Sequence, residues 1–248
     1  MIYFISDLHL GLGERSADKD RERLLLKFLS HIKPHTERLF ILGDLFDYWF
    51  EYKTVVQKQH IRTLAALADI VESGIPVDYV IGNHDFGHRN FFAEELGVTV
   101  HYSDVTVNLH GKTFMLAHGD CKELDSRKSR FIRSVLRNPL ALKAWTALHP
   151  DIGIGLASAA SRKSRIQSSL QPTANEREGL ERFARQSIGE GYDYVVMGHI
   201  HLPYTARLEY KGRSGLYVNT GDWLTHDSLV RFDGTTLELC ALTTMLCV

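Results

Sequence analysis

Short apolar segments, rich in β-branched and aromatic residues, recur along the chain, and each ends abruptly in a cluster of polar residues. Such segments are typical of buried strands that end at a functional edge of a sheet. Because α/β folds place their sites at strand ends, we expect these polar clusters to lie near one another. The six predicted strand ends belong to residues 2–5, 39–42, 77–81, 114–117, 194–197 and 216–218.

The segments between the first three predicted strands have helical periodicity. Apolar residues recur at i, i+3 and i+4 over residues 24–32 and again over residues 61–71, which predicts two helices packed on a sheet. Residues 98–117 and 204–242 instead contain turn signals that predict hairpins. The signals are His110-Gly111, Lys211-Gly212 and Asp233-Gly234. The sequence therefore predicts a mixed architecture, with βαβ units first and antiparallel strands later.

Residues 126–165 fit neither pattern. We predict two amphipathic helices, over residues 126–137 and 140–149, followed by Gly153-Ile154-Gly155 and then a short helix with an Ala/Ser-rich start. Nine basic side chains and one acidic one give this stretch a net charge of +8, although the whole chain carries −1. A basic helical insertion thus interrupts an acidic scaffold.

The composition of the chain excludes several classes of protein. With 248 residues, 44% hydrophobic and 24% charged, the chain resembles an ordinary globular protein, which argues against long disorder, collagen-like repeats or a bare coiled coil. The near-neutral charge, and a basic insertion without interleaved aromatic residues, argue against nucleic-acid binding. The three cysteines form no recognisable disulfide or zinc-binding pattern, which fits a reducing compartment. The sequence has neither a signal peptide nor a spanning segment of ~18–20 apolar residues. We expect a soluble protein.

Aspartate, histidine and asparagine side chains follow the predicted strands. Each cluster alone is weak evidence for a metal site, because a single histidine at a strand end usually has a structural role. Together they offer too many nitrogen and oxygen ligands for one ion and suit two divalent ions ~3.5–4 Å apart that share a carboxylate, a site for phosphoryl substrates. A set without cysteine favours Mn²⁺, Fe²⁺ or Zn²⁺ over ions that need thiolate. The predicted ligands are Asp7, His9, Asp44, Asn83, His118, His199 and His201.

The order of these motifs resembles the calcineurin-like metallophosphoesterase superfamily. Its signature, D-x-H, G-D-x-x-D, G-N-H-D, a histidine followed by glycine, and G-H-x-H, stands in order across residues 7–201. The resemblance implies a four-layer αββα sandwich of two mixed β-sheets flanked by helices, formed by a single domain of residues 1–248 with residues 122–175 as a helical cap. It also implies that Asp7, His9, Asp44 and His201 hold one ion, and that Asp44, Asn83, His118 and His199 hold the other.

Two further residues are candidates for catalysis. His84 follows the predicted ligand Asn83 and is placed to donate a hydrogen bond or a proton toward the leaving group. The superfamily pairs this histidine with the second acid of G-D-x-x-D, here Asp47. The alternative is that His84 only orients Asp47. Asp120 and Asp222 are expected to fix loops around the metals.

A closer resemblance concerns the substrate. Residues 4–10, residues 42–49 and the helical insertion after residue 120 are similar to the UDP-2,3-diacylglucosamine pyrophosphohydrolase family of lipid A synthesis. The resemblance implies cleavage of the diphosphate to UMP and 2,3-diacylglucosamine 1-phosphate, typically with Mn²⁺, by a cytoplasmic protein held peripherally at the inner face of the inner membrane. Well-known members carry arginine where this chain has His84, so a phosphodiesterase or phosphatase for another nucleotide or a soluble phosphoester is the alternative.

The insertion supplies the remaining candidates. Its apolar residues either face the core or line a groove for acyl chains beside the metals. Its charged residues either bind sugar and diphosphate or form a solvated basic face. The oligomeric state is not indicated. The predicted substrate-binding residues are Asn83, Asp125, Lys128, Ser161, Arg162 and Arg165.

Overall fold

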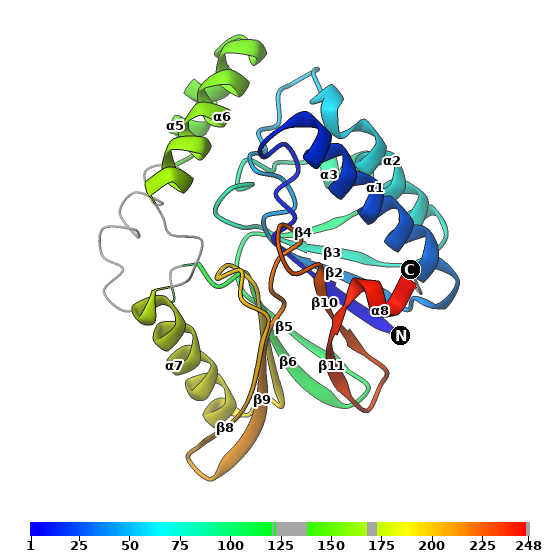
Figure 1. Ribbon diagram of the computed structural model, residues 1–248, viewed down its shortest axis with the longest axis vertical. Helices are drawn as coiled ribbons and strands as arrows, with labels where there is room; N and C mark the ends of the chain where they lie inside the picture. The colour runs from blue at the N-terminus through cyan, green and yellow to red at the C-terminus, as the bar shows by residue number, and fades with distance from the viewer. Residues whose placement is uncertain (121, 123–137, 168–172, 247–248) are drawn as a thin grey trace.

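A computed structural model of the chain describes residues 1–120, 122, 138–167 and 173–246. Two β-sheets pack face to face, and helices cover the outer face of each sheet (Figure 1). The four-layer αββα arrangement predicted from the sequence is therefore confirmed.

The first sheet is built on parallel βαβ units. Strands β1 (Ile2–Ile5), β2 (Arg38–Leu42) and β3 (Val77–Val80) pair in parallel and alternate with helices α1 (Arg15–Ile32) and α2 (Ile61–Glu72). Both helices carry the apolar stripe that the sequence predicts, and they bury it against the sheet. Two 3-10 turns, η1 (Lys33–His35) and η2 (Lys58–His60), complete these connections.

Later segments extend this sheet at both edges. Helix α3 (Phe91–Glu94) leads into β4 (Thr99–His101), which pairs in parallel with β3. At the other edge, β10 (Ser228–Phe232) pairs antiparallel with β1 and forms a hairpin with β11 (Leu237–Ala241), which ends in α8 (Leu242–Leu246). The order across the sheet is β11-β10-β1-β2-β3-β4.

The second sheet has the order β5-β6-β7-β9-β8. Its hairpins, β5 with β6 and β8 with β9, turn at the predicted glycines, and β6, β7 and β9 run parallel. One helix, α7, covers its outer face; α7 begins with a capping box of Thr173 and Glu176. The elements are β5 (Val105–Leu109), β6 (Lys112–Ala117), α7 (Ala174–Glu190), β7 (Tyr194–Met197), β8 (Tyr204–Tyr210) and β9 (Arg213–Asn219).

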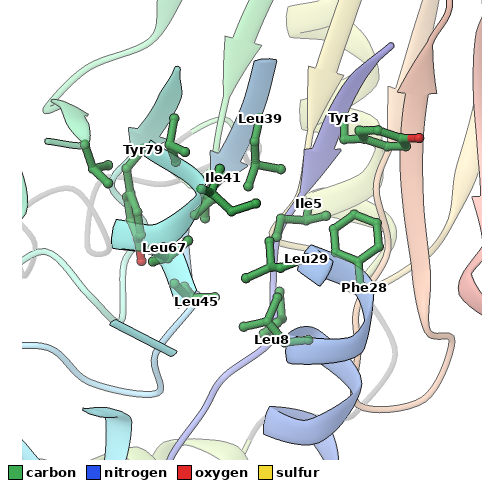
Figure 2. Packing of buried hydrophobic residues seen from close by; sticks show 14 of the residues in the cluster. Tyr3, Ile5, Leu8, Phe28, Leu29, Leu39, Ile41, Leu45, Leu67 and Tyr79 are labelled. Carbon is green, nitrogen blue, oxygen red and sulfur yellow. The ribbon is translucent and has the colours of Figure 1, made fainter. Parts of the chain in front are cut away.

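Three layers of apolar side chains hold the sandwich together. Between the sheets, Phe4 stacks on Phe40 at 5.1 Å and on Phe114 at 5.8 Å between ring centroids. Outside the first sheet, side chains of α1 and α2 interlock with those of β1, β2 and β3 (Figure 2). A third cluster joins α7 to the second sheet. Burying each large apolar side chain contributes ~1.5–3 kcal/mol, so these layers fix the strand ends in place.

Helices α5 (Pro139–Thr146) and α6 (Pro150–Gln167) project beyond the ends of the sheets (Figure 1). The predicted helix over residues 126–137 lies outside the described residues. The predicted interruption at Gly153-Ile154-Gly155 is wrong, because α6 runs continuously through both glycines. Each glycine costs a helix only about 1 kcal/mol relative to alanine, which the surrounding helix formers tolerate.

Candidate metal centre

The predicted ligands converge from both sheets. The backbone N–H of Asp7 donates to the Gly43 carbonyl at 3.1 Å, and that of His9 donates to the Asp44 carbonyl at 2.9 Å, which joins the loops after β1 and β2. The N–H of His199 donates to a carboxylate oxygen of Asp7 at 2.9 Å, which joins the two sheets. The ligand-bearing loops are those after β1 (Asp7, His9), β2 (Asp44), β3 (Asn83), β6 (His118) and β7 (His199, His201).

The backbone at this centre is unusual. Five predicted ligands have φ between 48° and 76°, a left-handed conformation that residues other than glycine seldom adopt. Each such residue costs on the order of 1–3 kcal/mol, and clusters of them are typical of functional sites. Gly82 is needed here as well, because a Cβ at this position would collide with the Asp44 carboxylate. The five residues are Asp7, His9, Asp44, His199 and His201.

Two buried carboxylates form the middle of the centre. Asp44 Oδ1 accepts a hydrogen bond from the N–H of His84 at 2.9 Å. Asp7 Oδ2 accepts hydrogen bonds from the hydroxyl of Ser6 and from the N–H of His199. These bonds leave Asp7 Oδ1 and Asp44 Oδ2 facing the histidines.

Imidazole nitrogens surround these two oxygens. His9 Nε2 lies 3.7 Å from both Asp7 Oδ1 and Asp44 Oδ2. His201 Nε2 lies 3.7 Å from Asp7 Oδ1, and His118 Nε2 lies 3.3 Å from Asp44 Oδ2. The triads Asp7-His9-His201, His9-Asp44-His84 and Asp7-Asp44-His118 each place three ligand atoms within 4.8 Å of one another.

The hydrogen-bond pattern of His118 indicates what this centre can hold. Its Nδ1 lies 2.8 Å from the Leu42 carbonyl, which only accepts, so Nδ1 carries the hydrogen. In the neutral ring the lone pair is then on Nε2, which faces Asn83 Oδ1 at 3.0 Å as well as Asp44. Burial lowers the pKa of His118, but the Asp44 carboxylate raises it more, so the site favours a positive charge between these electron-rich atoms, on the ring itself or on a bound cation. Nitrogen and oxygen donors of this kind fit divalent metal ions.

The charges of the centre also favour cation binding. Burial raises the pKa of Asp7 and of Asp44, but the histidines around them lower it more, so both stay well below the usual aspartate pKa. Burial and the Asp44 charge raise the pKa of Asp85 to about 6. Asp85 accepts hydrogen bonds from the N–H groups of Leu45 (2.9 Å) and Gly82 (2.8 Å), and so ties two ligand loops together.

Asp85 stands inside the G-N-H-D motif, but the sequence alone indicates no role for it. Its position after His84 was a local signal, but the partners of its carboxylate come from two different loops. Asp222 was expected to fix a loop near the metals. The structure gives it a specific partner, because its Oδ2 lies 3.1 Å from Nδ1 of His201.

His84 and Asp47 lie beside the metal ligands. His84 Nδ1 is 3.0 Å from the Asp47 carbonyl oxygen and 3.7 Å from a carboxylate oxygen of Asp47. The same carboxylate oxygen lies 3.6 Å from His9 Nδ1, and the His9 and His84 rings meet edge to face at 4.9 Å. The structure therefore brings the two predicted catalytic residues together at the edge of the centre.

The other predicted residues have varied positions. The ring of His199 packs against that of His118, with 5.1 Å between centroids. Asp125 and Lys128 lie outside the described residues. Ser161, Arg162 and Arg165 belong to the second half of helix α6, where the backbone is described and the side chains are not.

Helices α5 and α6 contact the loops that carry the candidate catalytic residues. The Trp145 ring on α5 packs on Phe50, three residues after Asp47, with 5.3 Å between centroids. Arg89, in the loop after β3, donates to the Thr146 hydroxyl at 3.1 Å. The helix pair is therefore packed against the loops that carry Asp47 and His84.

Within the described part of the chain, every helix is too short or too polar to cross a membrane.

Comparisons with known proteins identify the family of the chain. A profile of the calcineurin-like phosphoesterase family matches residues 1–203. The chain is 35% identical over 255 residues to a UDP-2,3-diacylglucosamine hydrolase from Porphyromonas gingivalis, with 96% of each chain covered. A UDP-2,3-diacylglucosamine hydrolase from Edwardsiella ictaluri is 28% identical over 240 residues, which cover 96% of this chain and 91% of the relative.

Among solved structures, a conserved uncharacterized protein of Streptococcus pneumoniae, described as a predicted phosphoesterase, is similar with a TM-score of 0.43. It is 13% identical in sequence, and the match covers 97% of this chain and 88% of the other.

Proposed function

The chain belongs to the calcineurin-like phosphoesterase family, and from this premise we propose that it hydrolyses UDP-2,3-diacylglucosamine. Water cleaves the diphosphate and gives UMP and 2,3-diacylglucosamine 1-phosphate. The observation that carries the proposal is the convergence of carboxylate, amide and imidazole ligand atoms from both sheets. The chain that holds them is similar over 96% of its length to a UDP-2,3-diacylglucosamine hydrolase.

This centre would hold two divalent ions, Mn²⁺ in the first instance. Asp7, His9, Asp44 and His201 would hold one ion, and Asp44, Asn83, His118 and His199 would hold the other. When bound, the ions lower the pKa of a water nucleophile and neutralise charge that develops on the phosphoryl oxygens. The chain's own part is to fix these side chains through the short backbone hydrogen bonds between the loops.

His84 protonates the leaving group. Its Nδ1 faces a carbonyl oxygen of Asp47, so Nδ1 carries a hydrogen and Nε2 is the nitrogen left for the substrate. In the imidazolium form Nε2 donates a proton to the departing phosphate oxygen. Asp47 holds the ring in place through its carbonyl and places its carboxylate charge near both His84 and His9.

Residues 122–175 form a cap on a single domain and bind the sugar, the diphosphate and the acyl chains of the substrate. Asp125, Lys128, Ser161, Arg162 and Arg165 contribute polar groups for the sugar and the diphosphate, together with Asn83. Four apolar side chains on α5, on α6 and in the turn between them are 38–76% exposed, which supports contact with acyl chains or with the lipid surface that contains them. They are Leu140, Leu148, Ile152 and Leu156. The protein works in the cytoplasm, attached peripherally to the inner membrane.

The experiment is an assay for UMP with Mn²⁺-loaded protein. We expect UMP from UDP-2,3-diacylglucosamine and much slower release from UDP-glucosamine, which lacks the acyl chains. A generic p-nitrophenyl phosphodiester that is cleaved while UDP-2,3-diacylglucosamine is not would favour the second candidate, a phosphodiesterase for soluble substrates. The observation that favours this second candidate is His84, at the position where well-known members of the lipid A family carry arginine.

A further inference from the structure

Asp222 lies directly behind the metal centre, on the loop between β9 and β10. Its side chain is only 4% exposed. One carboxylate oxygen, Oδ2, is 3.1 Å from Nδ1 of His201. The other, Oδ1, accepts hydrogen bonds from the backbone N–H groups of Thr225 (3.1 Å) and His226 (3.0 Å). The loop therefore fixes one side of the carboxylate and presents the other side to His201.

The Asp222 carboxylate determines how the His201 ring is protonated. A carboxylate only accepts hydrogen bonds, so the ring nitrogen that faces it carries the hydrogen. In the neutral ring, a hydrogen on Nδ1 leaves the lone pair on Nε2, which is the nitrogen 3.7 Å from Asp7 Oδ1. The His201 ring also stacks on His9 with 5.0 Å between centroids, which limits its rotation.

We propose that Asp222 is a positioning residue for the hydrolysis and selects the His201 tautomer whose Nε2 binds a divalent cation. This inference rests on the proposed function, because that function assigns His201 to metal binding. Asp222 acts through His201 and is itself held by the loop. His226 adds a further contact, since its Nδ1 lies 3.0 Å from Asp222 Oδ1.

The variant Asp222→Asn separates tautomer selection from simple support of the loop. Two backbone N–H groups point at Oδ1 and require an acceptor, so the amide oxygen of the asparagine takes that position. Its NH₂ group then faces His201 Nδ1. A donor in that place matches only a ring that carries its hydrogen on Nε2. The variant keeps the size of the side chain and the bonds of the loop, but it puts a hydrogen on the nitrogen that must bind the cation.

The test uses the whole chain loaded with Zn²⁺, a d¹⁰ ion that permits NMR of the histidine rings. Correlation spectra of ¹⁵N-labelled protein, with His201 assigned from the His201→Gln variant, should show the hydrogen on Nδ1. In Asp222→Asn we expect the affinity for one Zn²⁺ to fall ~10–100-fold, the usual effect of losing a carboxylate behind a metal-binding histidine. Asp222→Glu, which restores an acceptor, should recover part of this affinity.

Asp233→Asn is the matched control. Asp233 Oδ1 likewise accepts hydrogen bonds from two backbone N–H groups, those of Thr235 (2.8 Å) and Thr236 (2.7 Å), but in the exposed turn between β10 and β11. This variant should bind Zn²⁺ as the wild type does.

Two results would overturn the proposal: a hydrogen on Nε2 of His201 in the wild type, or wild-type Zn²⁺ affinity in Asp222→Asn. The first measurement needs no substitution at Asp222. It is also made on metal-free protein, where no ion on Nε2 fixes the tautomer, so a variant that does not fold still leaves the question decided. Failure of the proposed function looks different, because the wild type would then release no UMP while His201 still carried its hydrogen on Nδ1.

Discussion

The hydroxyl of Tyr52 occupies the space that a Cβ at position 153 would need, so Gly153 lets helix α6 approach the loop after β2. Tyr52 lies five residues beyond Asp47 in the same loop. The Trp145 Nε1 atom is also near, 3.5 Å from the position of that Cβ. This close approach, together with the packing of Trp145 on Phe50, seats the helix pair against the loop that also carries Asp47.

Gly153→Ala should displace helix α6. The added methyl group collides with the Tyr52 hydroxyl, so we expect KM for UDP-2,3-diacylglucosamine to rise about tenfold, equivalent to about 1.4 kcal/mol. Turnover of a small p-nitrophenyl phosphodiester, which does not need the helix pair, should stay unchanged. Steady-state kinetics with both substrates checks that only the reaction of UDP-2,3-diacylglucosamine is affected.

The chain offers a control and a rescue for this variant. A Cβ at Gly155 meets no atom within 4 Å, so Gly155→Ala should leave KM unchanged. Tyr52→Phe removes the colliding oxygen and leaves the ring carbon 3.7 Å from the new methyl group, so the double variant should regain a low KM. A double variant as impaired as Gly153→Ala alone would contradict this account.

Asp44→Asn should remove metal binding and activity together. Asp44 Oδ2 lies near both His9 (3.7 Å) and His118 (3.3 Å), so the loss of its charge affects both halves of the centre. We expect turnover to fall by about 10³-fold or more, because several kcal/mol of charge stabilisation are lost. Elemental analysis should find the ions missing. Asp20→Asn, at an exposed carboxylate paired with Arg23 on α1, should retain both ions.

His84→Ala should lower kcat without removing metal. General acid catalysis by one side chain contributes about 10²–10⁴-fold, which is the loss we expect. Metal content should match the wild type. Unchanged kcat in protein with full metal content would reduce His84 to a residue that only orients Asp47. His110→Ala is a suitable control, since this histidine is exposed and pairs with Glu37.

Acid should destabilise the fold through two buried histidines. Burial lowers the pKa of His60 and of His88 to about 3, against 6.5 for an ordinary histidine. Between these values the unfolded chain binds protons that the folded chain does not. The free energy of unfolding therefore falls as pH falls, by up to about 1.4 kcal/mol per pH unit for each histidine.

Urea unfolding at several pH values checks this prediction. His88→Phe, in a pocket of Trp49, Tyr79 and Phe92, should give a shallower decline of stability below about pH 6.5. The exposed His110, replaced in the same way, should leave the slope unchanged. An equal slope in His88→Phe and wild type would show that His88 accepts a proton in the folded state.

Much of the fold could be predicted because alternation and helical periodicity report burial directly. The strands that end before Asp7, Asp44 and His118 and the hairpin turns at Gly111, Gly212 and Gly234 are local patterns, and the structure has them as predicted. The continuous helix through Gly153 was not predictable in this way. The reason for that glycine is Tyr52, a residue distant in sequence, and local patterns carry no information about such contacts.

In the candidate centre, too, local motifs could be read from the sequence, whereas contacts between distant residues could not. The order of the motifs predicted which ligand residues converge. They follow the ends of parallel strands, and such ends lie at one edge of a sheet whatever the details of side-chain packing. The partner of His201 could not be derived, since the Asp222 carboxylate reaches it from a loop beyond β9. The tie that Asp85 makes between Leu45 and Gly82 depends equally on the folded geometry.

The convergence of both sheets on one centre has a consequence for how the protein acquires its activity. Asp7 comes from the loop after the first strand and His201 from the loop after the seventh. The hydrogen bond from the N–H of His199 to Asp7 closes only when the two sheets meet. Such long-range closure is a late and slow event in folding. A complete centre therefore requires both sheets to be in place, and a chain in which only one sheet has formed lacks the ligands that the other supplies.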